Sequence, residues 1–478
     1  MAGLTLAGVL LAGGLLAAVD DDKPNIIVIL ADDLGYGDVQ ALNPSGRVPT
    51  PHLDALAAES LVMTDAHSPC SWCIPTRYSL LTGRLPIGLN VKDKNRAVIP
   101  DGTATLPARL RDIDYATAMV GKWHLGFASG EPHLSDGVQP LVGGPCDRGF
   151  DTYFGIPRSL DQPPYYYIRD REPVARPTET IGDSGSEGWS PIQGTFWRKG
   201  GIAPGFAHDR VTPDVLSEAT QRLESLVEDD NPFFLYVALP SPHTPWAPTD
   251  EFAGKSDVPL YGDFLMQVDA GVGAFLDALD ATGEADDTIV VFTSDNGPVW
   301  YDAVDTPKHN HDATSVYRGM KGDAWEGGHR VPFFVRWPSH VAPRRSDALT
   351  CHADLFATLL AIADGDASLP GRRELDSLDT SGHWLRDEAA PRREFLERPS
   401  RNNQGYALRQ GTTKFIPFLG SGGFTKPSQR EPAVGEPSVQ LYDLATDPGE
   451  QTNLAGKQTD RVAELQSRYD DLMAAYDE

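Results

Sequence analysis

The segment NIIVILADD, residues 25–33, predicts a β-strand over residues 26–30 that leads into two carboxylates, Asp32 and Asp33. From Asn25 onward, similar short apolar runs alternate with helical patterns. This alternation is typical of an α/β fold whose strands form a largely parallel sheet. We therefore expect a large, mixed, mostly parallel sheet that is flanked by helices.

The other elements of this α/β unit follow from the same patterns. Strands are predicted at residues 116–120, 233–238, 288–293 and 332–336, and helices at residues 51–60, 105–111, 213–227, 261–281 and 354–363. Two stretches, residues 158–205 and 298–328, lack clear periodicity. We expect the first, rich in Pro, Gly and Tyr, to form a long surface excursion beside the mouth of the functional site.

The pattern changes beyond about Gly365 to short segments separated by turn residues. Strands are expected at residues 394–397, 405–409, 414–418 and 439–444, and a closing amphipathic helix at residues 461–476. This predicts a smaller C-terminal α+β subdomain that carries an antiparallel sheet and packs tightly on the first unit.

The chain is strongly acidic, with 41 Lys and Arg against 68 Asp and Glu among 478 residues, a formal charge of −27. This charge argues against general binding to nucleic acid or to anionic membranes. It would also repel an anionic ligand at long range. A site for such a ligand must therefore be locally positive, through Arg, Lys, His or a metal ion.

The N-terminal run, residues 4–18, is apolar and Gly- and Ala-rich, and it ends before three aspartates, Asp20 to Asp22. It reads as the core of a signal peptide over residues 1–22, although no basic residue precedes it. It is too short and too Gly-rich for a stable membrane span. We expect a secreted or periplasmic protein.

Polar residues follow four of the predicted strands at the point where each strand ends. They are Asp32 and Asp33, Lys122 and His124, His243, and Asp295 and Asn296. Ligands in open α/β sheets bind at the carboxyl ends of the strands, so these four clusters are expected to converge.

Two of these strand ends carry only oxygen ligands, namely Asp32 and Asp33, and Asp295 and Asn296. Three carboxylates and an amide suit a hard divalent cation, and calcium is favoured over magnesium when the ligands are many and flexible. Taken singly, each pair is more typical of a helix cap or a tight turn. The metal interpretation depends on the two pairs together with the segment around Cys73.

The segment SWCIPTRYSLLTG, residues 71–83, combines a cysteine with proline and arginine. Pro75 is suited to a first helical turn, which would place Cys73 near a helix N-terminus, where exposed N–H groups favour an anion. Arg77 adds a planar donor fork that matches a tetrahedral oxyanion. By itself such a cysteine would be a small buried apolar residue.

This segment, C-x-P-T-R followed by L-L-T-G, resembles the signature of the sulfatases, the formylglycine-dependent, arylsulfatase-like branch of the alkaline phosphatase superfamily. GKWHLG at residues 121–126, RGMK at 318–321, EGGHRVP at 326–332 and LYDL at 441–444 extend the resemblance from Asn25 to Leu454. One departure is Asp114, where the family has glycine, and a changed turn is expected there. The resemblance implies an alkaline-phosphatase-like fold, with a catalytic domain at residues 23–365 and the smaller subdomain at 366–478.

The resemblance also implies roles for individual residues. An external formylglycine-generating enzyme would convert Cys73 to formylglycine, whose hydrate attacks sulfur, and calcium would be held at Asp32, Asp33, residue 73, Asp295 and Asn296. Arg77, Lys122 and Lys321 would neutralise the sulfuryl oxygens, His124 would accept a proton, and His243 or Lys321 would protonate the leaving alcohol. For the lysines and histidines, a solvent-exposed or packing role is the alternative.

Other residues are candidates for contact with the rest of the substrate. His309 and His311 would contact the rest of the substrate, or else be exposed to solvent or packed. Tyr165 to Tyr167 and Trp300 would stack on sugar rings, or else only pack loops. With Cys73 assigned to chemistry, at most one disulfide remains among Cys70, Cys146 and Cys351.

The expected function is hydrolysis of a sulfate monoester, with sulfated carbohydrates as the natural class and aryl sulfates as artificial substrates. One alternative is a phosphate or phosphonate ester hydrolase, against which the EGGHRVP element and the two lysines weigh. A second is a calcium-dependent glycan-binding protein without catalysis. No nucleic acid partner is expected.

Overall fold

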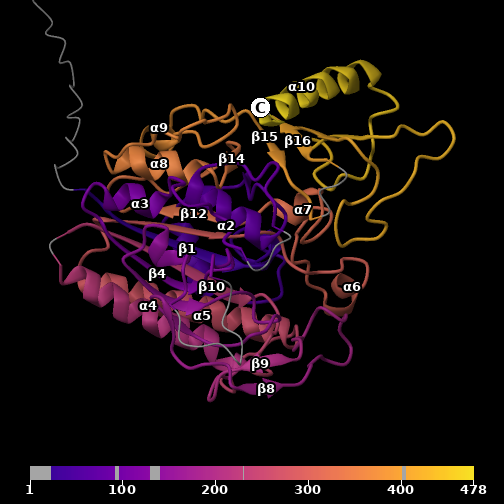
Figure 1. Cartoon of the computed structure of the whole chain (residues 1–478). Coiled ribbons are helices and arrows are strands. Elements are labelled where there is room, and N and C mark those ends of the chain that lie inside the picture. Colours follow the sequence, from indigo (N-terminus) through magenta and orange to yellow (C-terminus); the bar gives the residue numbers. More distant parts are fainter. Residues whose placement is uncertain (1–22, 92–95, 130–139, 230, 401–404, 478) are drawn as a thin grey trace, which may run out of the picture.

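The computed structural model describes residues 23–91, 96–129, 140–229, 231–400 and 405–477. The predicted signal peptide, residues 1–22, lies outside these ranges. The rest forms a large sheet between two layers of helices, with a smaller sheet and the helix α10 (Thr459–Asp477) on one side (Figure 1).

The large sheet has ten strands in the order β13-β2-β12-β11-β1-β10-β4-β5-β6-β7. Its five central strands run parallel: β11 (Thr288–Ser294), β1 (Asn25–Asp32), β10 (Phe233–Pro242), β4 (Ala116–Lys122) and β5 (Thr152–Ile156). The flanking strands are β13 (Arg344–Ser346), β2 (Leu61–Met63), β12 (Phe333–Arg336), β6 (Ile168–Arg169) and β7 (Glu172–Pro173). Antiparallel pairs occur only toward the edges in the part described, β12 with its two neighbours and β5-β6-β7. The predicted mixed, mostly parallel sheet is confirmed.

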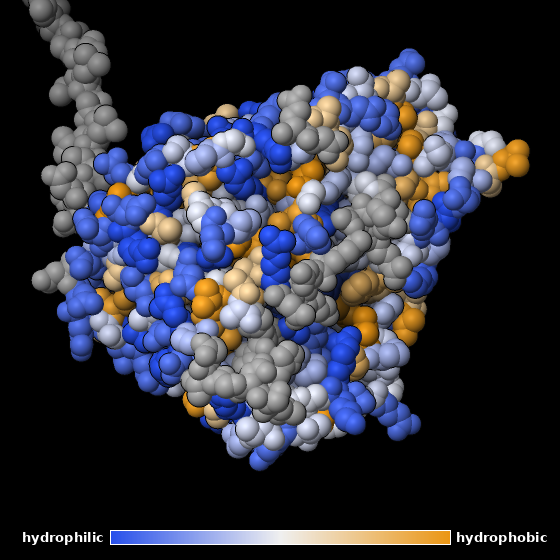
Figure 2. All heavy atoms as spheres, in the orientation of Figure 1, coloured by the Kyte–Doolittle hydropathy of each residue, from blue (hydrophilic) through white to orange (hydrophobic). Residues whose placement is uncertain are grey.

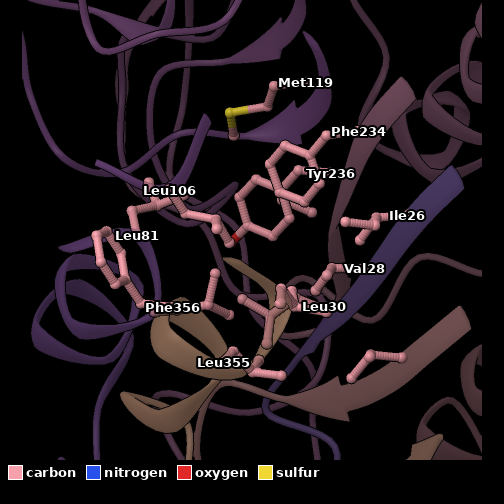
Figure 3. Close-up of a cluster of buried hydrophobic side chains, with 14 of the residues drawn as sticks. Ile26, Val28, Leu30, Leu81, Leu106, Met119, Phe234, Tyr236, Leu355 and Phe356 are labelled. Atoms are coloured by element: carbon pink, nitrogen blue, oxygen red, sulfur yellow. The ribbon is translucent and has the colours of Figure 1, made fainter. Parts of the chain in front are cut away.

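Helices cover both faces of this sheet (Figure 1). α1 (Pro51–Ala58), α4 (Val211–Val227) and α5 (Tyr261–Thr282) lie on one face, and α2 (Cys73–Thr82), α3 (Leu106–Arg111) and α8 (Asp354–Ile362) lie on the other. Alternate residues of β1 therefore enter two different cores. Ile26, Val28 and Leu30 pack with Phe234 and Phe356 toward α8, as Figure 3 shows, while Ile27 and Ile29 join the opposite core. This double burial explains why β1 reads as an uninterrupted apolar run.

Shorter elements connect these layers. They are η1 (Tyr36–Asp38), β3 (Ala66–His67), η2 (Pro145–Asp147), β8 (Glu179–Ile181), β9 (Gly200–Ile202), η3 (His208–Arg210), α6 (Asp305–His309), α7 (Glu326–His329), β14 (Thr350–Cys351) and α9 (Ser381–Arg386). Asp114 lies in the turn before β4 with φ 70°, a left-handed conformation that glycine adopts without steric cost. The turn thus accommodates the aspartate at the one position where the sequence departs from the family pattern.

The smaller sheet is antiparallel and consists of β15 (Glu394–Glu397), β16 (Ala407–Gln410), β17 (Thr413–Ile416) and β18 (Gln440–Asp443). Leu396, Leu408 and Phe415 of this sheet pack against Leu465 and Leu472 of α10. The predicted α+β character of the C-terminal part is therefore confirmed.

A buried ionic cluster joins the two sheets. Glu326, at the start of α7, contacts Arg330 at 3.0 Å, Arg409 of β16 at 3.1 Å and Lys414 of β17 at 3.1 Å. Lys414 also lies 3.3 Å from Glu450 in the segment after β18. EGGHRVP and the segment that follows LYDL thus hold the smaller sheet to the larger one. EGGHRVP, one of the motifs that carry the family resemblance, therefore has a structural role in this fold.

Glu397, the last residue of β15, gives a pH-dependent prediction. Burial raises the pKa of its carboxyl from 4.5 to about 8, against the opposing charge of Lys414. The folded state therefore binds this proton more tightly than the unfolded chain, so the stabilisation is complete below pH 4.5 and is lost as the pH rises toward 8. We expect Glu397→Gln to raise the free energy of unfolding by roughly 4 kcal/mol at about pH 8, and by about 1 kcal/mol or less at about pH 5.

Urea unfolding at the two pH values measures this difference. The exposed Glu431 supplies the matched control, because Glu431→Gln removes the same charge without burial and is expected to change neither value. An effect of Glu397→Gln that is equal at both pH values would contradict the assignment.

The exterior is predominantly hydrophilic on the face shown in Figure 2, with small separate apolar patches. The large exposed apolar side chains are scattered along the chain: Val142, Val174, Val304, Val316 and Val434. Within the described ranges, every helix is too short or too polar to cross a bilayer.

Candidate active site

Four neighbouring strands of the large sheet deliver polar residues to one edge. β11, β1, β10 and β4 lie in this order, and their registers keep the carboxyl ends level, with Ala31 opposite Ser294 and Asp32 opposite Pro242. Asp32, Asp33, Lys122, His124, His243, Asp295 and Asn296 all follow from these four ends. The expected convergence is thus a property of the parallel sheet.

Cys73 is the first residue of α2, and its side chain points into this cluster. Its Sγ lies 3.3 Å from Asp32 Oδ1 and 3.4 Å from Lys321 Nζ. Burial raises the pKa of the thiol well above its usual 9.0, and the Asp295 and Asp32 carboxylates raise it further. As a plain thiol, Cys73 is therefore protonated and a weak nucleophile.

Buried oxygen atoms lie beside Cys73. Asp33 has φ 65°, and this left-handed backbone follows directly after β1. Asn296 donates from Nδ2 to Asp33 Oδ1 at 2.7 Å, while its Oδ1 is buried without a hydrogen-bond partner among the described residues. Asp32, Asp33, Cys73 and His243 place ligand atoms within 4.8 Å of one another. Carboxylates and an unsatisfied amide oxygen fit a hard divalent cation such as calcium.

Three cations neutralise the three carboxylates. Arg77, one turn after Cys73, donates from Nε and Nη2 to Asp295 Oδ2 at 3.1 and 2.8 Å. Lys122 pairs with Asp32, and Lys321 Nζ lies 2.6 Å from Asp33 Oδ1. Lys122 is fully buried and Lys321 is 7% exposed, so all three pairs are shielded from solvent. The protein atoms alone thus form a balanced set of charges.

The two histidines reach the cluster differently. The Nδ1 of His243 lies 2.6 Å from the Thr244 carbonyl oxygen, so Nδ1 carries a proton and Nε2 faces Asp33 Oδ2 at 3.7 Å. His124 follows β4 with a left-handed φ of 59°. Desolvation, and then the charges of Lys122 and Arg77, lower the pKa of His124 well below 6.5. His124 is therefore neutral at pH 7 and able to accept a proton.

The segment that carries Lys321 is fixed between two parts of the site. The Lys321 N–H donates to the Pro298 carbonyl, just after Asn296, and the Gly322 N–H donates to the Ser71 carbonyl, just before Cys73. Close backbone contact is also needed here, because a Cβ on Gly297 would lie 1.9 Å from the Gly327 carbonyl oxygen. Gly297 and Gly327 thus allow the close contact between their two segments that helps to bring Lys321 to Cys73.

A cavity of about 420 Å³ opens onto this cluster. Cys73, His124, His243 and Lys321 line it together with residues of the irregular stretch 158–205, among them Arg158, Gln162, Phe196 and Arg198. The expected surface excursion therefore forms one wall of the cavity.

His309 and His311 do not line this cavity. His311 is 1% exposed, its Nε2 bonds Asp38 Oδ1 at 2.8 Å, and its Nδ1 lies 3.2 Å from the Arg47 N–H. His309 stacks on Trp189, with ring centroids 4.8 Å apart. Of the two roles expected for these histidines, the structure favours packing in the loop after β11 over contact with the substrate.

The aromatic residues predicted to stack on sugars are also mostly internal. Tyr165, Tyr166 and Trp300 are at most 2% exposed, and Tyr167 stacks on Phe154 with centroids 5.3 Å apart. The alternative, that they pack loops, is the one the structure supports. The four cysteines are all free and buried, so the one disulfide that the sequence would have permitted is absent from the structure.

Several cavity residues escaped sequence reasoning. The cavity walls include Trp72, and also Arg96, Phe196, Arg198 and Phe424, which come from loops without periodicity or a recognisable motif. Trp72 alone carried a signal, because it adjoins Cys73.

Comparisons with known proteins agree with this geometry. The family model described as Sulfatase matches residues 24–365. An N-acetylgalactosamine-6-O-sulfatase of Bacteroides thetaiotaomicron is 31% identical over 507 residues, covering 96% of this chain and 96% of that protein. Human arylsulfatase A is 35% identical over 476 residues, covering 93% of this chain and 85% of that protein.

The solved structures agree as well. One from Bacteroides thetaiotaomicron, described under the metabolism of multiple glycosaminoglycans, has a TM-score of 0.81 at 29% identity and covers 95% of this chain and 99% of that chain. The strand order and the cysteine at the start of α2 are consistent with these relatives. The chain therefore belongs to the sulfatase family of the alkaline phosphatase superfamily and is a sulfuric ester hydrolase.

Proposed function

We propose that this sulfatase cleaves the sulfate monoester of a sulfated carbohydrate, using formylglycine at position 73 and a bound calcium ion, with aryl sulfates as artificial substrates. The observation that carries the proposal is the placement of Cys73. Cys73 is the first residue of α2, and its side chain faces Asp32 and Lys321 and lines the cavity.

The modification at position 73 would supply the nucleophile. A hydroxyl of the hydrated aldehyde there would attack sulfur as the ester S–O bond breaks and the alcohol leaves. Re-formation of the aldehyde would then expel sulfate, and a water molecule would restore the hydrate. The Cys73 thiol, by contrast, is protonated and buried. A formylglycine-generating enzyme would convert Cys73, because this residue is the first of the C-x-P-T-R motif.

The chain's own residues would handle charge and protons. Arg77, Lys122 and Lys321 surround the position of the Cys73 side chain and would stabilise negative charge on the sulfuryl oxygens. His243 or Lys321 would give a proton to the leaving alcohol oxygen. His124, neutral at pH 7, would take the remaining hydroxyl proton from residue 73 as sulfate departs.

Asp32, Asp33, Asp295 and Asn296, with residue 73, would hold the calcium ion. When bound, the ion supplies Lewis-acid polarisation of oxygen and a template for orienting the sulfate. Charge supports this assignment. Because three carboxylates already face three cations, a divalent cation makes the site positive enough for a monoanionic ester on an otherwise acidic protein.

The substrate class rests on the relatives and on the cavity. One relative is an N-acetylgalactosamine-6-O-sulfatase and another an arylsulfatase, and both match over most of this chain. A cavity of about 420 Å³ has room for one sugar ring with its sulfate. We therefore propose a hexosamine 6-sulfate as the first substrate to test.

Matched aryl esters separate this function from its closest rival. We expect 4-nitrophenyl sulfate to be hydrolysed at least about 100-fold faster, by kcat/KM, than 4-nitrophenyl phosphate, because the site is built for one negative charge. Faster phosphate turnover would favour a phosphate or phosphonate hydrolase instead. For the non-catalytic alternative, mass spectrometry decides: an intact thiol at Cys73 in protein from its native host would favour a glycan-binding protein.

Export is a further part of the proposal, and it rests on the apolar run at residues 4–18. The measurement is the mass of the mature protein, which is expected to lack an N-terminal segment of about 15–30 residues. A mature protein that retains Met1 would contradict it.

A further inference from the structure

The cations deep in the site already have partners. Arg77, Lys122 and Lys321 are engaged by Asp295, Asp32 and Asp33. Arg96 is different, because it lines the same cavity, is exposed, and makes no side-chain hydrogen bond or ion pair within the described part of the chain. Among the described residues, it is thus a cation at the cavity wall that no other side chain neutralises.

The backbone of Arg96 is held against the catalytic segment after β4. Two residues later, the Val98 N–H donates to the Leu125 carbonyl at 2.8 Å. Gly126 has φ 69°, and a Cβ on it would lie 2.5 Å from the Arg96 carbonyl oxygen. Arg96 is therefore positioned next to the segment that carries His124, and the glycine permits this close approach.

The other charges on the wall do not cancel Arg96. Asp161 is the one carboxylate among the described residues that line the cavity, and it pairs with Arg198. Arg198 also covers the Phe196 ring, with its Cζ 4.8 Å from the centroid. Because this carboxylate is already paired, the described lining of the cavity offers Arg96 no carboxylate partner, on a chain whose net charge is −27.

Apolar side chains complete the lining. Ile74, Val98, Phe196, Val299 and Phe424 line the same cavity as Cys73 and Arg96. A sugar ring has apolar faces that suit such walls, while its charged substituents need cations. The cavity therefore combines one sulfate position, at Cys73, with a separate cation at Arg96.

We propose that Arg96 forms a subsite for a second anionic group of the substrate, which rests on the proposed sulfatase function. The group is an oxyanion, either the carboxylate of a uronic acid linked to the sulfated sugar or a second sulfate on the same sugar. A guanidinium binds either group through paired N–H donors. Arg96 thus selects an acidic, multiply charged saccharide over a simple sulfate ester.

The test compares wild type and Arg96→Ala on four substrates. These are a uronic acid–N-acetylgalactosamine 6-sulfate disaccharide, N-acetylgalactosamine 4,6-disulfate, N-acetylgalactosamine 6-sulfate and 4-nitrophenyl sulfate. We expect KM to rise about 10-fold for at least one of the two dianionic substrates, with kcat within about twofold. For the two monoanionic substrates, both constants stay within about twofold. Arg96→Lys is expected to recover part of the loss.

The two dianionic substrates identify the source of the second charge. A loss confined to the disaccharide assigns Arg96 to a carboxylate, and a loss confined to the disulfate assigns it to a second sulfate. Arg372→Ala is the matched control, since it removes an exposed arginine outside the cavity and lowers the net charge equally. It is expected to leave all four KM values unchanged.

Equal losses on all four substrates, or no loss on any, would overturn the subsite. Calorimetric binding of the disaccharide and the disulfate in a Cys73→Ala background keeps this result separate from catalysis. If wild type turns over no sulfate ester, the proposed function fails. The subsite then stands or falls on whether Arg96→Ala weakens this binding about 10-fold.

Discussion

Cys73→Ala lowers kcat for 4-nitrophenyl sulfate by a factor on the order of 10⁴ or more, because it removes the group that becomes the nucleophile. Arg77, Lys321 and the carboxylates stay in place, so substrate binding is expected to persist. Protein from a converting host is used for the comparison. In wild-type protein, the peptide that contains residue 73 should have lost hydrogen sulfide and gained one oxygen atom.

Cys351→Ala is the matched control for this variant. Cys351 is equally buried, but it lies in the core beneath the smaller sheet and does not line the cavity. Its loss is expected to lower the melting temperature and to leave kcat within about threefold. If Cys73→Ala kept more than about a tenth of wild-type kcat, the proposed nucleophile would be wrong.

Removal of calcium is the second large effect. Chelation is expected to lower kcat/KM by about 10²- to 10³-fold, and added calcium should restore it, because the anionic ester otherwise meets a site with balanced charges. Stability gives a readout that does not depend on turnover. Calcium at 100 times its Kd should add about 2.7 kcal/mol to the free energy of unfolding and raise Tm accordingly.

Asn296→Ala tests which residues hold the ion. Asn296 Oδ1 is buried and has no partner among the described residues, so its removal costs the protein no hydrogen bond at that atom. We expect the calcium midpoint in thermal unfolding to rise about 10- to 100-fold. Asp312→Asn, in a separate acidic group beside Asp302, should leave the midpoint unchanged. A Tm insensitive to calcium in wild type would refute the metal assignment.

Much of the fold was predictable because local patterns report it. The helix expected at residues 261–281 spans Tyr261–Thr282, and the one expected at 354–363 spans Asp354–Ile362. The apolar pattern predicts these elements because each helix buries one face in a core, and each central strand is buried along its whole length. The meeting of Asp32, Lys122, His243 and Asp295 was predictable for a related reason. Parallel strands bring their carboxyl ends to one edge, however far apart they lie in sequence.

Burial within loops was not predictable. His311, Tyr165 and Trp300 stand in irregular stretches, and their residue types suit both packing and sugar binding. Which applies depends on neighbours such as Asp38, whose side chain reaches His311 from another part of the chain. The structural role of EGGHRVP was not predictable for the same reason, because the partners of Glu326 lie 83 and 88 residues away in β16 and β17.

The sequence by itself determined the alternating α/β architecture, the family and the polar strand ends, because each is carried by residues close together in the chain. Only the tertiary structure decided that Arg96 lines the cavity without a partner among the described side chains, while Arg198 is neutralised by Asp161. Charge pairing and exposure depend on which distant segments meet, and irregular loops carry no periodic signal of that meeting.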